Sequence, residues 1–534
     1  MSKLFDFAAR AAGFLLGKNR LNDLIVNRLV GFGRARPHPW STKFDYVSWS
    51  GLSDRTYYAR LLPPKPYPPE ENVGGRRPPL SDVRALFACS GEQRRCPKST
   101  VLFPAFAQYL TDGFLRTRLQ NDPPFGSGVE ERARTTSNHD IDQSPLYGRN
   151  EAQTRALRTL SGGRLKSQIL DGEEHPLFLY DGGNRVRAEF CDAAGAPILD
   201  QPLGVDRSQA MQTLFAVGGD RVNATPQVAM LNTLFLREHN RLAGLLMAKN
   251  PDWDDDRLFE TARNSIIVMF IKIVVEEYIN HINTTNIAFS ARPQPAWRAR
   301  WNRPNWMTAE FSLLYRWHAL IPERMDWNGA DIHGRDLLLD NSLLLKGGLA
   351  DAFVAVSGNA AAELSLQNTA SFLLDAEQRG VAQAREVNIA PYNDYREAMK
   401  LRRQETFADI VGSSNDAAEA ARKEALAARL EQLYGSADNF EFFVGLFAEP
   451  RGENGPLPEL ITRMVAMDAF SQALTNPLLS EPVWGDREVR RLTFTDIGLD
   501  AIENTASLRD ILERNSTDLG DRFVGMTRRD WKRQ

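Results

Sequence analysis

The sequence predicts a mainly α-helical protein, built as one large helical domain with an N-terminal amphipathic arm. Long stretches place apolar residues at helical spacing, and no alternating strand pattern or internal repeat competes with them. A chain of 534 residues with 43% hydrophobic residues also allows a large core. Length alone would allow roughly two to four domains. We expect an arm over 1–43, a proline-rich connector packed on the body over 44–80 and the helical domain over 81–534.

The arm combines apolar and basic residues. Between residues 3 and 30 the apolar side chains recur at helical spacing, with Arg10, Lys18 and Arg28 among the basic residues between them. A helix of this kind lies either in a membrane interface or against the protein body. We favour packing on the body, which is the ordinary role of an amphipathic helix, and keep peripheral membrane contact as the alternative.

Proline and glycine positions mark the connector and the helix boundaries. Seven prolines and two adjacent glycines between Leu61 and Pro79 exclude a helix there. Thr225-Pro226 suits a helix start, and Gly435 suits a helix end. The helical patterns beyond the connector cover Ser81–Cys89, Val101–Gln120, Thr225–Lys249, Asp256–Ile282 and Asp416–Leu433.

Charge and cysteine content narrow the functional classes. A net charge of -3 and a pI near 6.3 give no whole-chain attraction to nucleic acid. Cys89, Cys96 and Cys191 are too few and too widely spaced for a disulfide framework or a four-ligand zinc site. The longest apolar run, over 266–275, is too short to span a bilayer, and the N-terminal residues lack a clear secretory cleavage pattern. We expect a cytoplasmic protein and keep peripheral contact of the arm with the inner membrane surface as the alternative.

Most of the histidines have ordinary surroundings. Polar, turn-like sequence predicts solvent exposure for His139, His175 and His333. Helical patterns with charged neighbours indicate structural roles for His239 and His281.

His318 differs from these, because Tyr315 lies three residues before it in aromatic and apolar sequence. That spacing predicts two side chains on one helical face, one turn apart. A redox cofactor bound by the histidine could exchange an electron with the phenol. Taken alone, however, the spacing favours a packed core pair.

The sequence around this pair resembles the animal-type haem peroxidase superfamily, and within it the cyclooxygenase and plant α-dioxygenase branch. Glu310-Phe-Ser-Leu-Leu-Tyr-Arg-Trp-His-Ala-Leu-Ile-Pro322 is similar to the segment that holds the family's proximal histidine. The matching blocks together span about residues 44 to 485. In family order they are Tyr46–Trp49 to Leu62–Pro64, Phe106–Gln108, Ile141–Gly148, Leu234–Arg241 and Leu433–Glu449.

The resemblance implies roles for residues near the proximal segment. His318 would be the axial iron ligand with Trp317 beside the haem, Tyr315 the radical residue, and Tyr278 the phenol that hydrogen-bonds it. After reaction with a peroxide, the haem would supply the oxidising power, and the radical would remove hydrogen from a fatty acid before dioxygen adds. Phe311 and Leu314, which precede the tyrosine, would line the substrate channel.

On the distal side, the resemblance assigns catalytic and haem-contacting roles to Gln108 and Asp112, with Arg221 as a further catalytic group. Asp112 departs from the family, in which a histidine is expected at this position. Peroxide activation needs a base, and an aspartate serves only when it is ionised. The charge of Arg221 would keep Asp112 ionised if the two are close. We therefore expect slow peroxide activation with retained oxygenase chemistry.

Further departures narrow the prediction. Thr111 and Ala224 stand where mammalian peroxidases bond haem through carboxylates, which implies non-covalent haem b, and no calcium loop is recognisable.

Ser471 matches the channel serine that aspirin acetylates in cyclooxygenases. Met467 replaces a glycine that lets the substrate fold, which implies a linear hydroperoxide. Arg28 aligns approximately with the arginine that binds the substrate carboxylate, and a solvated charge is the alternative.

Together these implications predict a haem-dependent fatty-acid dioxygenase that takes an unsaturated fatty acid and O2. Two alternatives stay open. One is a conventional haem peroxidase that oxidises small donors with H2O2. The other is a haem-binding or membrane-associated protein without activity, against which the retained Tyr315, Tyr278 and His318 argue.

Overall fold

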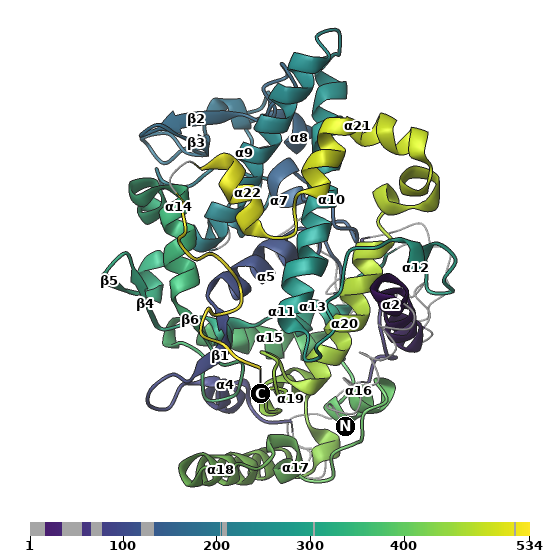
Figure 1. Ribbon diagram of the computed structural model, residues 1–534. Helices are drawn as coiled ribbons and strands as arrows, with labels where there is room; N and C mark the ends of the chain where they lie inside the picture. The colour runs from purple at the N-terminus through teal and green to yellow at the C-terminus, as the bar shows by residue number, and fades with distance from the viewer. Residues whose placement is uncertain are drawn as a thin grey trace.

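The structure is a computed structural model that describes residues 17–34, 56–65, 77–118, 133–202, 204, 211–302, 305–516 and 519–533. These residues are mainly helical, and the sheets among them are three pairs of short antiparallel strands (Figure 1). The buried apolar side chains form one continuous core. The predicted mainly α-helical class is confirmed.

The elements follow one another along the chain with few long gaps. The first helices are α2 (Lys18–Arg34), α4 (Leu80–Phe87), α5 (Leu102–Asp112), α7 (Ser144–Tyr147) and α8 (Glu151–Leu157). The central group is α9 (Pro226–Lys249), α10 (Asp255–Ile273), the π-helix η3 (Val274–Ile279), α11 (Asn280–Ile282), α12 (Gln294–Trp297), α13 (Ala309–Leu314) and the 3-10 turn η4 (His318–Leu320). The remaining helices are α14 (Ser342–Gly358), α15 (Leu374–Glu386), α16 (Tyr392–Ala398), α17 (Phe407–Val411), α18 (Ala417–Tyr434), α19 (Phe442–Ala448), α20 (Glu459–Leu474), α21 (Arg487–Glu503) and α22 (Leu508–Asn515).

The strand pairs are short and lie at the margins of the helical body. Two of them are hairpins, in which Ser167 pairs with Pro176 and Arg324 with His333. The third pair joins distant parts of the chain. The pairs are β1 (Arg95–Thr100) with β6 (Ala360–Ala362), β2 (Ser167–Leu170) with β3 (Glu173–Pro176), and β4 (Arg324–Trp327) with β5 (Ala330–His333).

Helices α9 and α10 run side by side through the middle of the molecule, and α5 packs against α9 (Figure 1). The first four turns of α9 are buried on all sides, polar residues included. His239 in this stretch contacts the Tyr147 hydroxyl through Nδ1 at 2.9 Å and the Gly163 carbonyl through Nε2 at 2.8 Å. Buried polar groups need such contacts, so His239 stabilises the scaffold, as its sequence context indicates.

Several predicted boundaries hold and others do not. In α18, the Asp416 side chain accepts from the Glu419 N–H at the start, and Gly435 ends the helix with φ at +71°. Helix α5 ends at Asp112 instead of continuing to Gln120, and the long helix predicted to end at Ile282 contains the π-helix η3.

The prediction of exposed histidines is wrong for two of them. His139 and His175 are both 1% exposed. The ring of His139 accepts a hydrogen bond from the Met307 N–H at 2.8 Å. Burial, together with the charge of Arg237, lowers the pKa of His175 to about 4. Distant parts of the chain cover these rings, which local polarity does not reveal.

The described part of the arm packs on the body. Helix α2 lies against α20 and α12, with Val26 and Val30 buried (Figure 1). Asp23 pairs with Arg292 at 3.0 Å. The remainder of the arm and the block Tyr46–Trp49 lie outside the described residues. Within the described residues, no helix combines the length and apolar character needed to cross a membrane.

The packing of α15 on α19 predicts a stability effect. A Cβ at Gly380 would come within 2.5 Å of Phe443 Cζ. In Gly380→Ala this overpacking costs about 1–3 kcal/mol and exceeds the gain in helix propensity, about 1 kcal/mol, so urea unfolding should show a net loss of stability. Gly358→Ala, with no atom within 4 Å of the added Cβ, is the control and should be neutral or stabilising. Equal stability of the two variants would contradict this account.

Candidate active site

The segment from Tyr315 to His318 is the centre of the site, and it is not a continuous helix. Helix α13 begins with the Thr308 side chain accepting from the Phe311 N–H at 3.1 Å, and it ends at Leu314. Tyr315 caps it, and the turn η4 begins at His318. The prediction that Tyr315 and His318 share one helical face is therefore wrong.

The segment instead presents consecutive side chains to one cavity of about 630 Å³. Tyr315, Arg316, Trp317 and His318 all line it. A helix turns by about 100° per residue, so four consecutive side chains could not face one space from a regular helix. The other walls come from α5, the start of α9, α15 and the turns before α9 and α14. Their residues include Val101, Ala105, Gln108, Thr111, Arg221, Ala224, Val228, Leu337, Arg379, Gln383 and Glu386.

His318 is held from behind by a carboxylate. Its Nδ1 lies 3.3 Å from Oε2 of Glu377, which is fully buried on α15. Both atoms are buried, their approach falls outside standard hydrogen-bond geometry, and neither has another hydrogen-bond partner. The side chain of His318 is nevertheless 30% exposed, so the rest of the ring faces the cavity that it lines. A histidine with Nδ1 on a carboxylate and its other nitrogen free is the usual arrangement of a metal ligand.

Guanidinium groups make the cavity basic. Arg118, Arg221, Arg316 and Arg379 line it. Burial, together with the charge of Arg221, lowers the pKa of Arg316 to about 10. Cations enclosed near one another are stabilised by anions, so the cavity is suited to a ligand that carries carboxylates.

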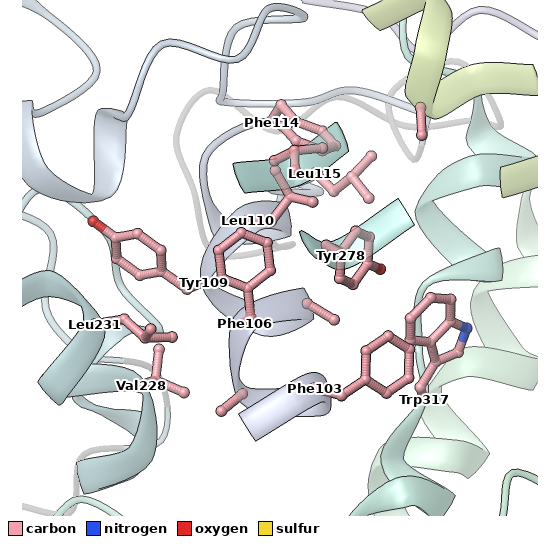
Figure 2. Packing of buried hydrophobic residues seen from close by; sticks show 14 of the residues in the cluster. Phe103, Phe106, Tyr109, Leu110, Phe114, Leu115, Val228, Leu231, Tyr278 and Trp317 are labelled. Carbon is pink, nitrogen blue, oxygen red and sulfur yellow. The ribbon is translucent and has the colours of Figure 1, made fainter. Parts of the chain in front are cut away.

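Aromatic rings surround the proximal segment. Tyr315 stacks on Trp317 with ring centroids 4.5 Å apart, and Trp317 stacks on Phe103 of α5 at 5.6 Å. Phe103 also stacks on Tyr278 at 5.5 Å, and Figure 2 shows these rings grouped beside α5. The Tyr278 hydroxyl makes no hydrogen bond of standard geometry, yet it interacts with Tyr315 and lowers the pKa of that phenol. Burial outweighs this effect and raises the pKa of Tyr315, so the phenol is protonated at neutral pH.

Asp112 does not line the cavity, although Gln108 and Arg221 do. It is 2% exposed and points at the next loop, where its Oδ2 accepts from the Arg221 backbone N–H at 3.3 Å. A Cβ at Gly219 would come within 2.1 Å of the same oxygen, so only glycine fits there.

The prediction that Arg221 keeps Asp112 ionised is also wrong. Burial and the neighbouring carboxylate of Asp220 raise the pKa of Asp112 to about 8, and Arg221 only partly offsets them. Asp220 itself pairs with Arg116 at 3.0 Å. Burial alone would raise the pKa of Asp220, but Arg221 and Arg116 outweigh it and lower that pKa. The two carboxyl groups therefore share one proton at neutral pH, and Asp220 carries the charge.

The residues predicted to bind substrate are not among those that line the cavity. Phe311 packs on the Tyr315 ring at 4.7 Å, and Leu314 is fully buried. Met467 and Ser471 are buried on α20, and neither lines the cavity.

Helix α20 nevertheless comes close to the tyrosine, because the charge of Asp468 contributes to the raised pKa of Tyr315. The Ser471 hydroxyl of that helix donates to the Asp468 carbonyl at 2.9 Å. At the surface, Arg28 is on the exposed face of α2.

Comparison with known proteins identifies the family. The family model described as animal haem peroxidase matches residues 113–523, more than half of the chain. The chain belongs to the animal haem peroxidase family. Prostaglandin G/H synthase 1 of Mus musculus is 30% identical over 488 residues, which are 90% of this chain and 74% of the mouse protein. Prostaglandin G/H synthase 2 of Bos taurus is 27% identical over 487 residues, with the same coverage.

Solved structures share the fold of this chain. The fatty acid alpha-dioxygenase of Oryza sativa matches with a TM-score of 0.69 and 16% identity, over 96% of this chain and 94% of that one. Peroxidase A from Dictyostelium discoideum matches with a TM-score of 0.68 and 19% identity, over 89% and 95% of the two chains. The chain is thus an oxidoreductase with the peroxidase fold, and haem is the cofactor that its family implies.

The residues of the cavity fit haem. His318 presents the free side of a carboxylate-held ring, and the basic groups match the charge of haem propionates. Apolar side chains such as Val101, Ala105 and Val228 supply contacts for a flat macrocycle. Thr111 and Ala224 also line the cavity, and neither carries a carboxylate.

Two of these site residues lie beyond the sequence prediction. Glu377 belongs to α15, far from His318 along the chain, and no local pattern links the two. Arg316 stands inside the proximal segment, where its charge between two aromatic residues was the available signal.

The shared proton predicts a pH-dependent stability. In the folded protein Asp112 keeps its proton up to about pH 8, whereas an unfolded aspartate releases it near pH 3.8. The wild type therefore loses stability from this group as the pH rises through that window. An asparagine side chain cannot titrate, so the unfolding free energy of Asp112→Asn relative to wild type should rise from pH 5 to pH 8, by at most about 1.4 kcal/mol per pH unit. Urea titrations measure it.

The matched control is Asp375→Asn, which removes a carboxylate that is 73% exposed. Its stability relative to wild type should change little over the same pH range. A difference between Asp112→Asn and wild type that stays constant from pH 5 to pH 8 would contradict a shared proton.

Proposed function

We propose that the protein is a haem-dependent dioxygenase that adds O2 to an unsaturated fatty acid and gives a hydroperoxide. One observation carries the proposal: Tyr315 lines the same cavity as His318, packs on Phe311 of α13 and lies near Asp468 of α20. The similarity to prostaglandin G/H synthases supports the proposal. The shared fold with a fatty acid alpha-dioxygenase supports it as well.

His318 would bind the iron of haem b through its free nitrogen, and Arg316 and Arg379 would meet the propionates. The binding would be non-covalent, because Thr111 and Ala224 offer no carboxylate for an ester bond. Bound haem, after reacting with a peroxide, supplies the one-electron oxidation of Tyr315. Trp317 stacks on Tyr315 and also lines the cavity, so it would hold the phenol in place beside the cofactor.

Tyr315 would perform the hydrogen transfer. Its raised pKa keeps the proton on the phenol until oxidation removes an electron and a proton together. The resulting radical takes a hydrogen atom from a substrate C–H bond, so the O–H bond reforms and a carbon radical remains. Dioxygen adds to that carbon. The peroxyl radical takes the hydrogen atom back from Tyr315, which gives the hydroperoxide and restores the tyrosyl radical.

The α20 side of Tyr315 would hold the substrate chain. Phe311 and Leu314 supply apolar contacts, and Ser471 and Met467 stand on the facing helix. The Met467 side chain takes space that a folded chain would need, which favours a linear product. Arg28, exposed on α2, would attract the fatty-acid carboxylate where substrate enters from the membrane surface. We infer no calcium requirement.

A conventional peroxidase is the second candidate, because Gln108 and Arg221 line the cavity as a peroxide-binding pair would. The protonated Asp112 beneath them argues against rapid turnover. On stopped-flow mixing with H2O2, the haem-loaded protein should react slowly at pH 7, and small-donor oxidation should be unaffected in Tyr315→Phe. Rapid peroxide reaction together with no oxygen uptake on fatty acids would favour the peroxidase.

The central prediction concerns Tyr315. Tyr315→Phe removes the only O–H bond that the cycle breaks, so oxygen uptake with oleate, linoleate or arachidonate should fall to background while haem stays bound. Tyr278→Phe is the matched control: it removes a neighbouring phenol and should reduce uptake without abolishing it. An oxygen electrode measures the rate, and mass spectrometry locates the oxygenated carbon. Equal uptake by wild type and Tyr315→Phe would rule out the proposed cycle.

A further inference from the structure

The pairing of Glu377 with His318 is the feature of the cavity that the reaction cycle above does not use. Glu377 is 0% exposed, and its Oε2 lies 3.3 Å from His318 Nδ1. The other oxygen, Oε1, accepts from the Thr369 hydroxyl at 3.3 Å. Apart from His318, no basic group forms an ion pair with Glu377 among the described residues.

A fully buried carboxylate is costly unless a partner compensates it. Removing an isolated carboxylate from water costs several kcal/mol, so the chain keeps one only where it is paired. Here the neutral hydroxyl of Thr369 contributes one hydrogen bond, and the charge of Arg316 acts from a greater distance. The His318 imidazole, 3.3 Å away, is therefore the principal group that can compensate the Oε2 side of Glu377.

The same contact fixes the histidine. With its proton on Nδ1 and directed at Glu377, the ring keeps its other nitrogen unprotonated and free to donate to a metal. A carboxylate acceptor at Nδ1 also pushes electron density into the ring, which makes Nε2 a stronger donor than an amide or carbonyl acceptor would. Strong donation favours the higher oxidation state of a bound iron.

We propose that Glu377 is a positioning residue that sets the donor strength of His318 and thereby stabilises the ferric over the ferrous state of the bound haem. The inference rests on the proposed ligation of haem iron by His318. It assigns Glu377 no contact with substrate or with the reacting atoms. Its effect passes through one contact, the 3.3 Å approach of Nδ1 of the ring to Oε2 of the carboxylate.

The site also offers a well-matched control. Asp375 lies two residues before Glu377 on α15, and its side chain is 73% exposed and pairs with Arg84 at 3.0 Å. Asp375→Asn removes one carboxylate charge from the same helix without touching His318. Any effect that follows from charge on α15 in general would therefore appear in both variants.

The experiment compares haem-loaded wild type, Glu377→Gln, Glu377→Asp and Asp375→Asn. Resonance Raman spectra of the ferrous proteins give the iron–histidine stretching frequency, and redox titration gives the Fe(III)/Fe(II) midpoint potential. In Glu377→Gln the stretch should move to lower frequency, and the ferric form should lose at least about tenfold in relative stability, which raises the potential by about 59 mV. Asp375→Asn should match wild type in both measurements.

Glu377→Asp keeps the charge but withdraws it by one methylene, so it should shift both measurements in the same direction by less. It decides the question if Glu377→Gln does not fold. Unchanged stretch and potential in haem-loaded Glu377→Gln or Glu377→Asp would overturn the inference, as would equal shifts in Asp375→Asn. A wild type without any iron–histidine band would instead refute the ligation by His318, so the two failures are distinguishable.

Discussion

The end of helix α13 at Leu314 is the constraint on which the site depends. Because the backbone leaves the helix at Tyr315, with φ at -89° and ψ at 15°, the next three side chains turn toward the same cavity. Tyr315 can then stack on Trp317, and His318 can reach Glu377. One more helical turn would separate these groups around the helix axis, and neither the tyrosine nor the histidine would meet its present neighbours.

Helix α15 keeps the cavity in shape, because it is fixed on three sides. Gly380 lets it approach Phe443 closely, and the buried ion pair of Arg385 with Glu441, at 2.6 Å, ties its end to the segment before α19. Its third contact is Glu377 with His318. A cavity of about 630 Å³ removes packing contacts from a close-packed interior, so the walls around it need such independent support.

The sequence predicts helix boundaries well where the signal is local, and poorly where residues distant in the sequence determine where a helix ends. Asp416 and Gly435 bound α18 because caps act within one turn, whereas Gly113 ends α5 although apolar residues continue beyond it. The π-helix η3 keeps nearly the same apolar spacing as an α-helix, so periodicity could not reveal it.

Within the site, motif resemblance was enough to bring Gln108, Arg221 and His318 to one cavity. The proton on Asp112 depends on Asp220, which lies far from it along the chain. The contact of buried Glu377 with His318 likewise joins residues that are distant in the sequence. Electrostatics of this kind follow from the fold and not from spacing.

The charges around the cavity leave it with an excess of positive charge. Behind α5, Asp112 and Asp220 share a proton, so together they supply only one carboxylate charge to the two guanidinium groups of Arg221 and Arg116. On the proximal side the carboxylate of Glu377 is directed at His318 and acts on Arg316 only at a distance. Among the described residues, four guanidinium groups and one carboxylate, that of Glu386, line the cavity, so positive charge is in excess and an anionic ligand compensates it best. A haem with two propionates meets that requirement and places its iron where the carboxylate-backed ring of His318 is free to bind.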